Sequence, residues 1–165
     1  MSHINLGLPL VFWIGACAQG EPVRVLDAAN WVIVTDRSDP WALEAPPDAD
    51  CSQSSFFEEE GYFEVSMEGC SWGTWTQPIP DSLNRGAQLE VELFHQDLWA
   101  PLPATAVVEL AIGPDVVVEW SAAIPTASGR YDLFGRAPRN LEGPAFLHVH
   151  NHGLNSYRVG DVFAR

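Results

Sequence analysis

The sequence predicts an all-β protein, an antiparallel β-sandwich of about eight strands. Short runs of alternating or β-branched residues recur along the chain, and Gly, Pro, Asp and Asn separate them. The 13 glycines and 13 prolines leave little room for long helices. A length of 165 residues fits one domain plus a short appendage.

The expected strands, in chain order, are Trp31–Thr35, Tyr62–Met67, Gln88–His95, Ala106–Ile112, Val116–Trp120, Ala145–Asn151 and Tyr157–Ala164. The third strand shows the alternation best, because Leu89, Val91 and Leu93 are separated by Glu90 and Glu92. Residues that favour turns separate the strands, for example at 84–86, 113–115 and 143–144.

The amino end predicts an export signal that is cleaved. Leu6–Ala16 is an uncharged apolar run, too short to cross a bilayer but typical of a secretory signal. It leads into Ile14-Gly15-Ala16-Cys17, which resembles the bacterial lipobox. The resemblance implies a signal peptide at 1–16, a lipidated Cys17 that anchors the protein to a membrane, a tether at 17–26 and a domain at 27–165.

The signal departs from the usual pattern because Met1–Asn5 contains no Lys or Arg. The alternatives are a start upstream, cleavage elsewhere, or a buried strand with a chance cysteine. Ala18 follows the cysteine where enteric inner-membrane lipoproteins tend to have Asp. The lipobox resemblance therefore favours an outer-membrane anchor, with the domain in the periplasm or at the cell surface.

The two cysteines that remain after lipidation, Cys51 and Cys70, are expected to form a disulfide in an oxidising compartment. The bond would enclose the acidic segment Ser52–Gly69 and stabilise the fold by about 3 kcal/mol. The alternative is a pair of free thiols.

Three segments carry a second resemblance. They are a first strand near Trp31, the Gly-x-x-Leu-x-Val-x-Leu pattern of Gly86–Leu93, and Asn155–Val162 near the end of the chain. In this order they resemble galactose-binding-like jelly rolls, the fold of many carbohydrate-binding modules, over Asp27–Arg165. The resemblance implies a jelly-roll sandwich and makes sugar binding one of several expected roles.

Histidines form the most concentrated chemical signal. His148, His150 and His152 occupy alternate positions, so an extended strand places them on one face. Paired imidazoles on one strand are typical copper or zinc ligands, and we take these three and His95 as candidate ligands. The alternation of its own strand points His95 toward the core instead. The competing interpretation is a hydrogen-bonded corner without metal.

Aromatic and amide side chains are candidates for sugar binding. The candidates are Trp72, Trp75, Trp99, Asn151 and Asn155. Trp72 and Trp75 are three residues apart, so in an extended chain they point to opposite faces and one is expected to reach solvent. Packing of the tryptophans in the core is the alternative.

Charge excludes one class of partner. The net charge of −14 would repel a nucleic acid. The acidic stretch Asp36–Asp50 is a candidate for weak calcium binding, although a solvated surface explains it as well. Glu58–Glu60 is expected to be exposed too.

No catalytic motif is present: the chain has no nucleophile elbow, zinc-protease helix or phosphate loop. We therefore expect a lipoprotein whose domain binds a ligand without catalysis and without a cofactor, with carbohydrate or an envelope protein as partner. The alternatives are a transition-metal protein or metalloenzyme that uses the histidines, and a structural envelope protein.

Overall fold

The computed structural model describes residues 21–35, 38–66, 69–150, 152–153 and 155–165. The segment predicted as a signal peptide, the sequence that resembles a lipobox and Cys17 lie outside the described residues, and so does Asn151. No helix in the described part of the chain has the length and apolar character needed to cross a membrane.

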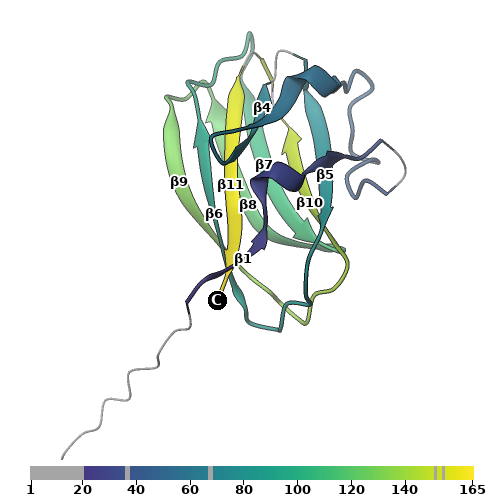
Figure 1. Ribbon diagram of the computed structural model, residues 1–165. Coiled ribbons are helices and arrows are strands. Elements are labelled where there is room, and N and C mark those ends of the chain that lie inside the picture. Colours follow the sequence, from purple (N-terminus) through teal and green to yellow (C-terminus); the bar gives the residue numbers. More distant parts are fainter. Residues whose placement is uncertain (1–20, 36–37, 67–68, 151, 154) are drawn as a thin grey trace, which may run out of the picture.

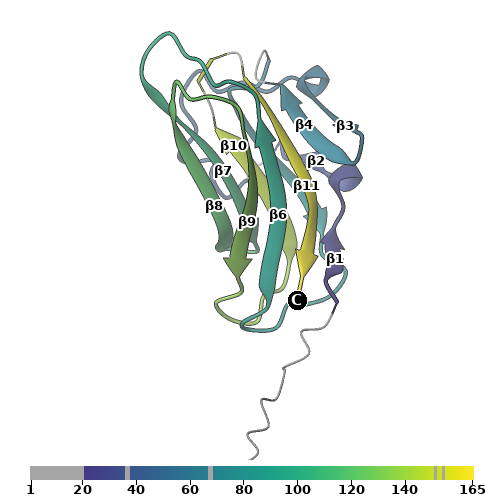
Figure 2. The same ribbon diagram turned by 90° about the vertical axis from the view of Figure 1, so that its left-hand side faces the viewer.

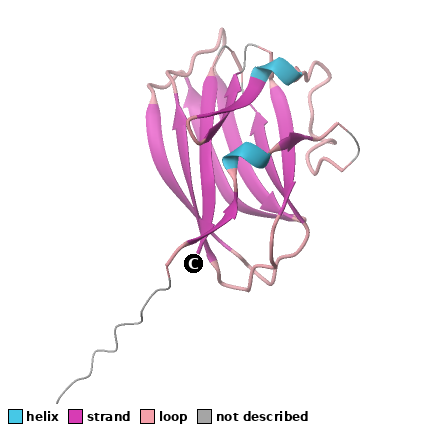
Figure 3. Ribbon diagram, in the orientation of Figure 1, coloured by secondary structure: helices cyan, strands magenta, loops and turns pink. Residues whose placement is uncertain are grey.

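Two antiparallel sheets make up nearly the whole fold (Figures 1 and 3). The first, sheet A, has the order β3-β4-β11-β6-β9, with β1 also pairing with β11. Its strands are β1 (Val23–Leu26), β3 (Phe56–Glu59), β4 (Tyr62–Ser66), β6 (Gln88–His95), β9 (Gly129–Arg136) and β11 (Ser156–Ala164).

The second sheet, sheet B, has the order β2-β5-β10-β7-β8. Its strands are β2 (Val32–Ile33), β5 (Trp72–Pro78), β7 (Ala104–Ile112), β8 (Asp115–Ile124) and β10 (Pro144–His150). Two short 3-10 helices, η1 (Ala28–Asn30) and η2 (Gln53–Ser55), complete the described elements. Figure 2 shows the two sheets face to face.

The core lies between the sheets because alternate residues of each strand point inward. In β6, Leu89, Val91 and Leu93 are buried. From β5 and β10, Trp75 and Leu147 meet them from the other sheet, and both are less than 2% exposed. The β-sandwich predicted from the sequence is confirmed.

Several boundaries differ from the sequence prediction. Eleven strands occur among the described residues instead of about eight, since β1, β3, β5 and β9 were not expected. Strand β1 starts inside the predicted tether, and Leu26 is buried in the core. The strand expected at Trp31–Thr35 shortens to Val32–Ile33, because Trp31 ends η1 and turns inward.

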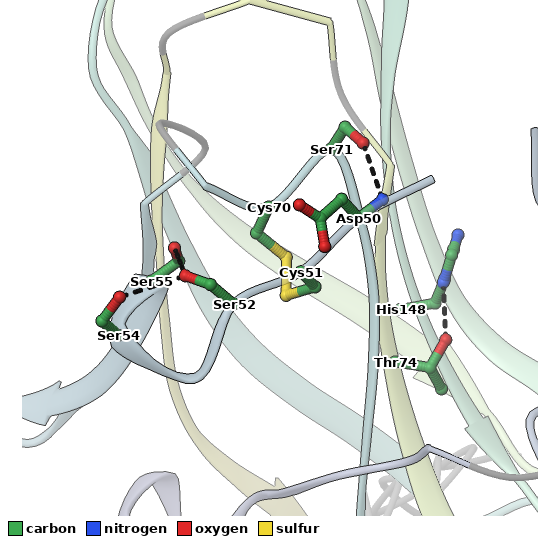
Figure 4. The surroundings of a disulfide bond; sticks show 9 residues. All are labelled: Asp50, Cys51, Ser52, Ser54, Ser55, Cys70, Ser71, Thr74 and His148. Carbon is green, nitrogen blue, oxygen red and sulfur yellow. Dashed lines mark hydrogen bonds between the residues drawn. A yellow bond between two sulfur atoms is a disulfide. The ribbon is translucent and has the colours of Figure 1, made fainter. Parts of the chain in front are cut away.

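The predicted disulfide is confirmed: Cys51 and Cys70 are bonded, with an S–S distance of 2.00 Å (Figure 4). The described residues of the enclosed segment include η2 and the β3–β4 hairpin. Glu58 closes that hairpin, since its carboxylate accepts a hydrogen bond from the backbone N–H of Gly61 (2.8 Å).

Candidate functional site

The outward face of sheet B carries the aromatic side chains that define the candidate site. In β10, Leu147 and Val149 point into the core, while Phe146, His148 and His150 point away from it. This is the alternation that the sequence predicts for the histidine strand. Strand β5 pairs with β10 and places Trp72 opposite His150.

Five rings on this face contact one another in series. Trp41 stacks on His148 with centroids 4.7 Å apart and planes 16° from parallel. Trp72 meets His148 at 4.4 Å and His150 at 4.6 Å. His150 meets His152 at 4.7 Å. We call this series, Trp41, His148, Trp72, His150 and His152, the ring ladder.

The ring ladder runs from a buried end to an exposed end. Trp41 is 6% exposed and His148 only 1%. Trp72 and His150 are half-buried, and His152 is exposed. The exposed end lies where β10 finishes and β5 begins, at the upper end of the sandwich in Figure 1. The accessible part of the ring ladder is therefore at this end.

A hollow of about 360 Å³ continues the exposed end of the ring ladder. His152 forms one wall, and the chain from Ala100 to Ala104 forms the rest. Trp99 precedes this segment and is 59% exposed, the largest exposed aromatic side chain in the described residues. His152 thus offers an accessible ring in the wall of this hollow, and the exposed Trp99 precedes the segment that forms the rest of the wall.

Asn155 is buried and links the backbone of Trp99 to that of His152. Its Oδ1 accepts a hydrogen bond from the backbone N–H of Trp99 (2.7 Å), and its Nδ2 donates to the carbonyl of His152 (3.2 Å). Gly153 has a φ of +104°, and a Cβ there would lie 2.0 Å from the carbonyl oxygen of Trp99. Asn155 and Gly153 therefore position the two rings.

Two histidines of the ring ladder, His148 and His150, are held neutral. His148 shares a hydrogen bond with the hydroxyl of Thr74 (Nδ1 to Oγ1, 2.9 Å; Figure 4). Burial, followed by the nearby His150, lowers the pKa of His148 to about 3. Burial and His152 also lower the pKa of His150. A neutral imidazole has one donor and one acceptor nitrogen, so it suits a hydroxyl-bearing ligand.

Two sequence candidates lie away from the ring ladder. Trp75 points into the core, where it packs against Phe56 and Phe63 and is fully buried. Trp72 and Trp75 thus occupy opposite faces of β5, as expected. His95 also points inward, from the other sheet. Its Nδ1 contacts the carbonyl of Gln96 (2.7 Å), and its Nε2 lies 3.3 Å from the hydroxyl of Tyr131.

The four candidate histidines are therefore not brought together. His148, His150 and His152 share the outward face of sheet B, whereas His95 lies inside the sandwich on β6. Within the ranges that the structure describes, no three His, Cys, Asp or Glu side chains gather in a way that would hold a metal ion.

The acidic candidates have local structural roles or face solvent. Asp39 caps the turn before Trp41, whose backbone N–H it binds at 2.9 Å. Glu44, Asp48 and Asp50 are exposed. On the outward face of sheet A, Glu90 pairs with Arg165 (3.0 Å), and Glu92 accepts hydrogen bonds from Tyr62 and Arg130. Asp36 lies outside the described residues.

Trp41 is the residue of the site that sequence reasoning missed. It lies in a Pro-rich, acidic stretch that predicts only a loop, and no local pattern indicates which surface it packs on. Alternation along the histidine strand does predict that Phe146 shares the face of His148, and there Phe146 contacts Trp41.

Known proteins resemble this chain in fold rather than in sequence. No protein-family model matches the chain, and no curated protein matches it. The K3 cleaved adhesin domain of Lys-gingipain from Porphyromonas gingivalis matches 87% of this chain and 98% of its own, at 16% identity and a TM-score of 0.52.

Two further solved structures score lower. A CBM4 structure matches 82% of this chain and 88% of its own, at 12% identity and a TM-score of 0.47. The K1 cleaved adhesin domain of Lys-gingipain matches 88% and 98%, at 11% identity and a TM-score of 0.46. The likeness to the K3 domain shows that this chain has the β-sandwich fold of a bacterial adhesin domain.

Proposed function

We propose that this protein is a non-catalytic carbohydrate-binding domain that Cys17 anchors to a bacterial outer membrane. The observation that carries the binding role is the ring ladder, whose exposed residue His152 is linked through Asn155 to the backbone of Trp99, an exposed tryptophan. The fold shared with an adhesin domain is compatible with binding without catalysis.

The chemistry of the exposed end suits a neutral sugar. A pyranose has an apolar face of C–H groups, which stacks on an aromatic ring, and a rim of hydroxyls that need hydrogen-bond partners. Trp72, Trp99 and His152 supply the rings. The neutral His150 supplies a donor and an acceptor at the same place.

The chain enters the domain at the end opposite the exposed end of the ring ladder. Strand β1 pairs with the last residues of β11, so the chain enters the domain beside its carboxyl terminus (Figures 1 and 2). The exposed end of the ring ladder is at the other end, where β10 finishes and β11 starts. A lipid on Cys17 would therefore leave the ring ladder facing away from the membrane.

Calorimetric titration after a glycan screen tests the binding role. Trp99→Ala and His152→Ala are expected to weaken binding of the best neutral oligosaccharide by about tenfold or more each. Phe134→Ala is the matched control, because Phe134 is 67% exposed and lies on sheet A. Equal losses in all three variants, or no binding to any glycan, would contradict the proposal.

A further inference from the structure

One segment of the chain already occupies part of the outward face of sheet B. Residues Ser38–Asp50, which we call the strap, connect β2 to the disulfide-bonded Cys51 and appear beside β5 at the right of Figure 1. Trp41 is buried against sheet B, whereas its neighbours Ala42 and Leu43 are exposed, Leu43 completely. The strap thus packs one large side chain, that of Trp41, against the outward face of sheet B.

The place that Trp41 fills has a defined chemistry. Its indole ring stacks on His148 and packs against Ala111 and Phe146, and it donates a hydrogen bond to the carboxylate of Glu109. We call this place, bounded by those four side chains, the Trp41 slot. It offers a flat stacking surface, an apolar wall and a hydrogen-bond acceptor at the edge.

The strap contacts the sheet through Trp41 in its middle and through Asp50 at its end, where the carbonyl of Asp50 accepts hydrogen bonds from the backbone N–H groups of Ser71 (2.8 Å) and Trp72 (3.5 Å). The backbone N–H groups of Ala42, Glu44 and Ala49 bond to carbonyls of the strap itself. At the two ends the chain is fixed, by the bond from Val34 to the carbonyl of Thr74 and by the disulfide. Withdrawal of Trp41 would therefore leave the sheet pairing and the main core unchanged.

We propose that the Trp41 slot is a second saccharide subsite, which extends the ring ladder inward and which Trp41 occupies as an intramolecular substitute for ligand. The proposal rests on the carbohydrate-binding role of the ring ladder. An indole presents an apolar face and one N–H donor, and a pyranose presents an apolar face and hydroxyl donors. The ring and apolar side chains of the slot can therefore contact the apolar face of either group, and the carboxylate of Glu109 can accept a hydrogen bond from either.

Charge restricts the sugars that the slot accepts. Burial, followed by Glu119 and Glu44, raises the pKa of Glu109, so these three carboxyl groups influence one another. Glu119 pairs directly across from Glu109 in the sheet. An anionic sugar would add to this repulsion. Uncharged sugar chains are the ligand class that fits.

The first test uses free indole and does not depend on sugar binding. In Trp41→Ala, removal of the side chain leaves a ring-shaped space, and indole added in solution is expected to bind there and raise the melting temperature. The unmodified protein should show no such effect. Absence of indole binding in a folded Trp41→Ala protein would overturn the proposal.

The second test compares oligosaccharides of increasing length by calorimetry. Trp41→Ala is expected to bind a neutral tri- or tetrasaccharide about tenfold more tightly than the unmodified protein, because a competing occupant is removed. Its affinity for a monosaccharide should be unchanged. Leu43→Ala, in the same strap, is the control and should match the unmodified protein for both ligands.

Two variants cover the case in which Trp41→Ala does not fold. Trp41→Phe keeps a ring but loses the hydrogen bond to Glu109. It should therefore also bind long oligosaccharides more tightly than the unmodified protein, by a smaller factor than Trp41→Ala. Adding Glu109→Gln to a Trp41 variant should reduce the gain in affinity for long oligosaccharides. Unchanged or weaker binding of long oligosaccharides by both Trp41 variants would overturn the subsite. Indole binding without any glycan binding would refute the carbohydrate role and, with it, this subsite.

Discussion

His148 shows how burial and a neighbouring imidazole keep a histidine neutral. It lies between Trp41 and Trp72 and shares a hydrogen bond with Thr74. Its pKa falls from 6.5 to about 3, since burial removes water from the charged form. The ring therefore stays neutral across the physiological range and keeps one donor and one acceptor nitrogen.

The same shift predicts a loss of stability in acid. The unfolded histidine binds a proton near pH 6.5, while the folded one resists protonation until about pH 3, so acidification through this window favours the unfolded state. The contribution of His148 to unfolding free energy should fall by about 2 kcal/mol between pH 7 and pH 5. Urea titrations should show a smaller pH dependence in His148→Gln. An identical dependence in both proteins would contradict a buried neutral ring.

The packing around Gly73 leaves no room for a side chain. A Cβ at this position would lie 2.3 Å from the ring of Trp75 and 2.9 Å from the sulfur of Cys70. Gly73→Ala is therefore expected to destabilise the protein by about 2–3 kcal/mol. Gly160→Ala is the control, because its Cβ would make only ordinary contacts at 3.5 Å or more. Comparable unfolding free energies for the two variants would refute this packing.

Removal of metal ions tests the alternative assigned to the histidine strand. We expect dialysis against a chelator to change neither the melting temperature nor glycan affinity, because the ring ladder acts through stacking and hydrogen bonds. Elemental mass spectrometry should find no stoichiometric copper, zinc or calcium. A bound transition metal that is lost in His150→Ala would support the metal-binding alternative instead.

At the scale of elements, the disulfide ties the strap and the β3–β4 hairpin to the start of β5. The bond joins residues 19 apart in sequence. Replacing both cysteines with serine should lower the unfolding free energy by about 3 kcal/mol, as the unfolded chain gains freedom. Denaturant titration measures this loss. A change much below 1 kcal/mol would mean that the strap and hairpin hold their positions without the bond.

The strands that the sequence predicts are those with clean alternation. Strand β6 matches its predicted range because Leu89, Val91 and Leu93 are separated by glutamates. Strand β9 was missed, since the exposed Phe134 follows the inward-facing Leu133 and breaks the pattern. In β5, Gly73 and Pro78 suggest a loop, but pairing with β10 overrides that local preference.

Alternation along the strands also made part of the candidate site predictable. Period-two alternation places His148 and His150 on one face and Trp72 and Trp75 on opposite faces. It cannot predict which strands become neighbours, so the contact of Trp72 with both histidines required the structure. The contribution of Trp41 depends on how a long loop folds back, and no short-range pattern encodes that.

For the whole molecule, lipidation at Cys17 is a proposal that mass spectrometry can decide. The full chain expressed in a bacterium should carry acyl groups on Cys17 and partition into detergent, whereas Cys17→Ser should remain in the aqueous phase. Soluble material of unmodified mass from the parent sequence would refute the anchor and leave the binding role untouched.

The net charge of −14 sets a further expectation for the whole domain. Polyanionic glycans such as uronic acid polymers should bind more weakly than neutral ones of the same length, and added salt should narrow the difference. Parallel titrations at low and high ionic strength measure this. Stronger binding of the polyanion at low salt would contradict the electrostatic argument.

The most direct test of the central claim is an NMR titration that follows the indole N–H signals during addition of a neutral oligosaccharide. The exposed Trp99 and the half-buried Trp72, whose ring contacts His150, should shift in proportion to the bound fraction. The buried Trp31, Trp75 and Trp120 should not. Saturating glycan that leaves Trp72 and Trp99 unmoved would show that the ring ladder does not bind carbohydrate.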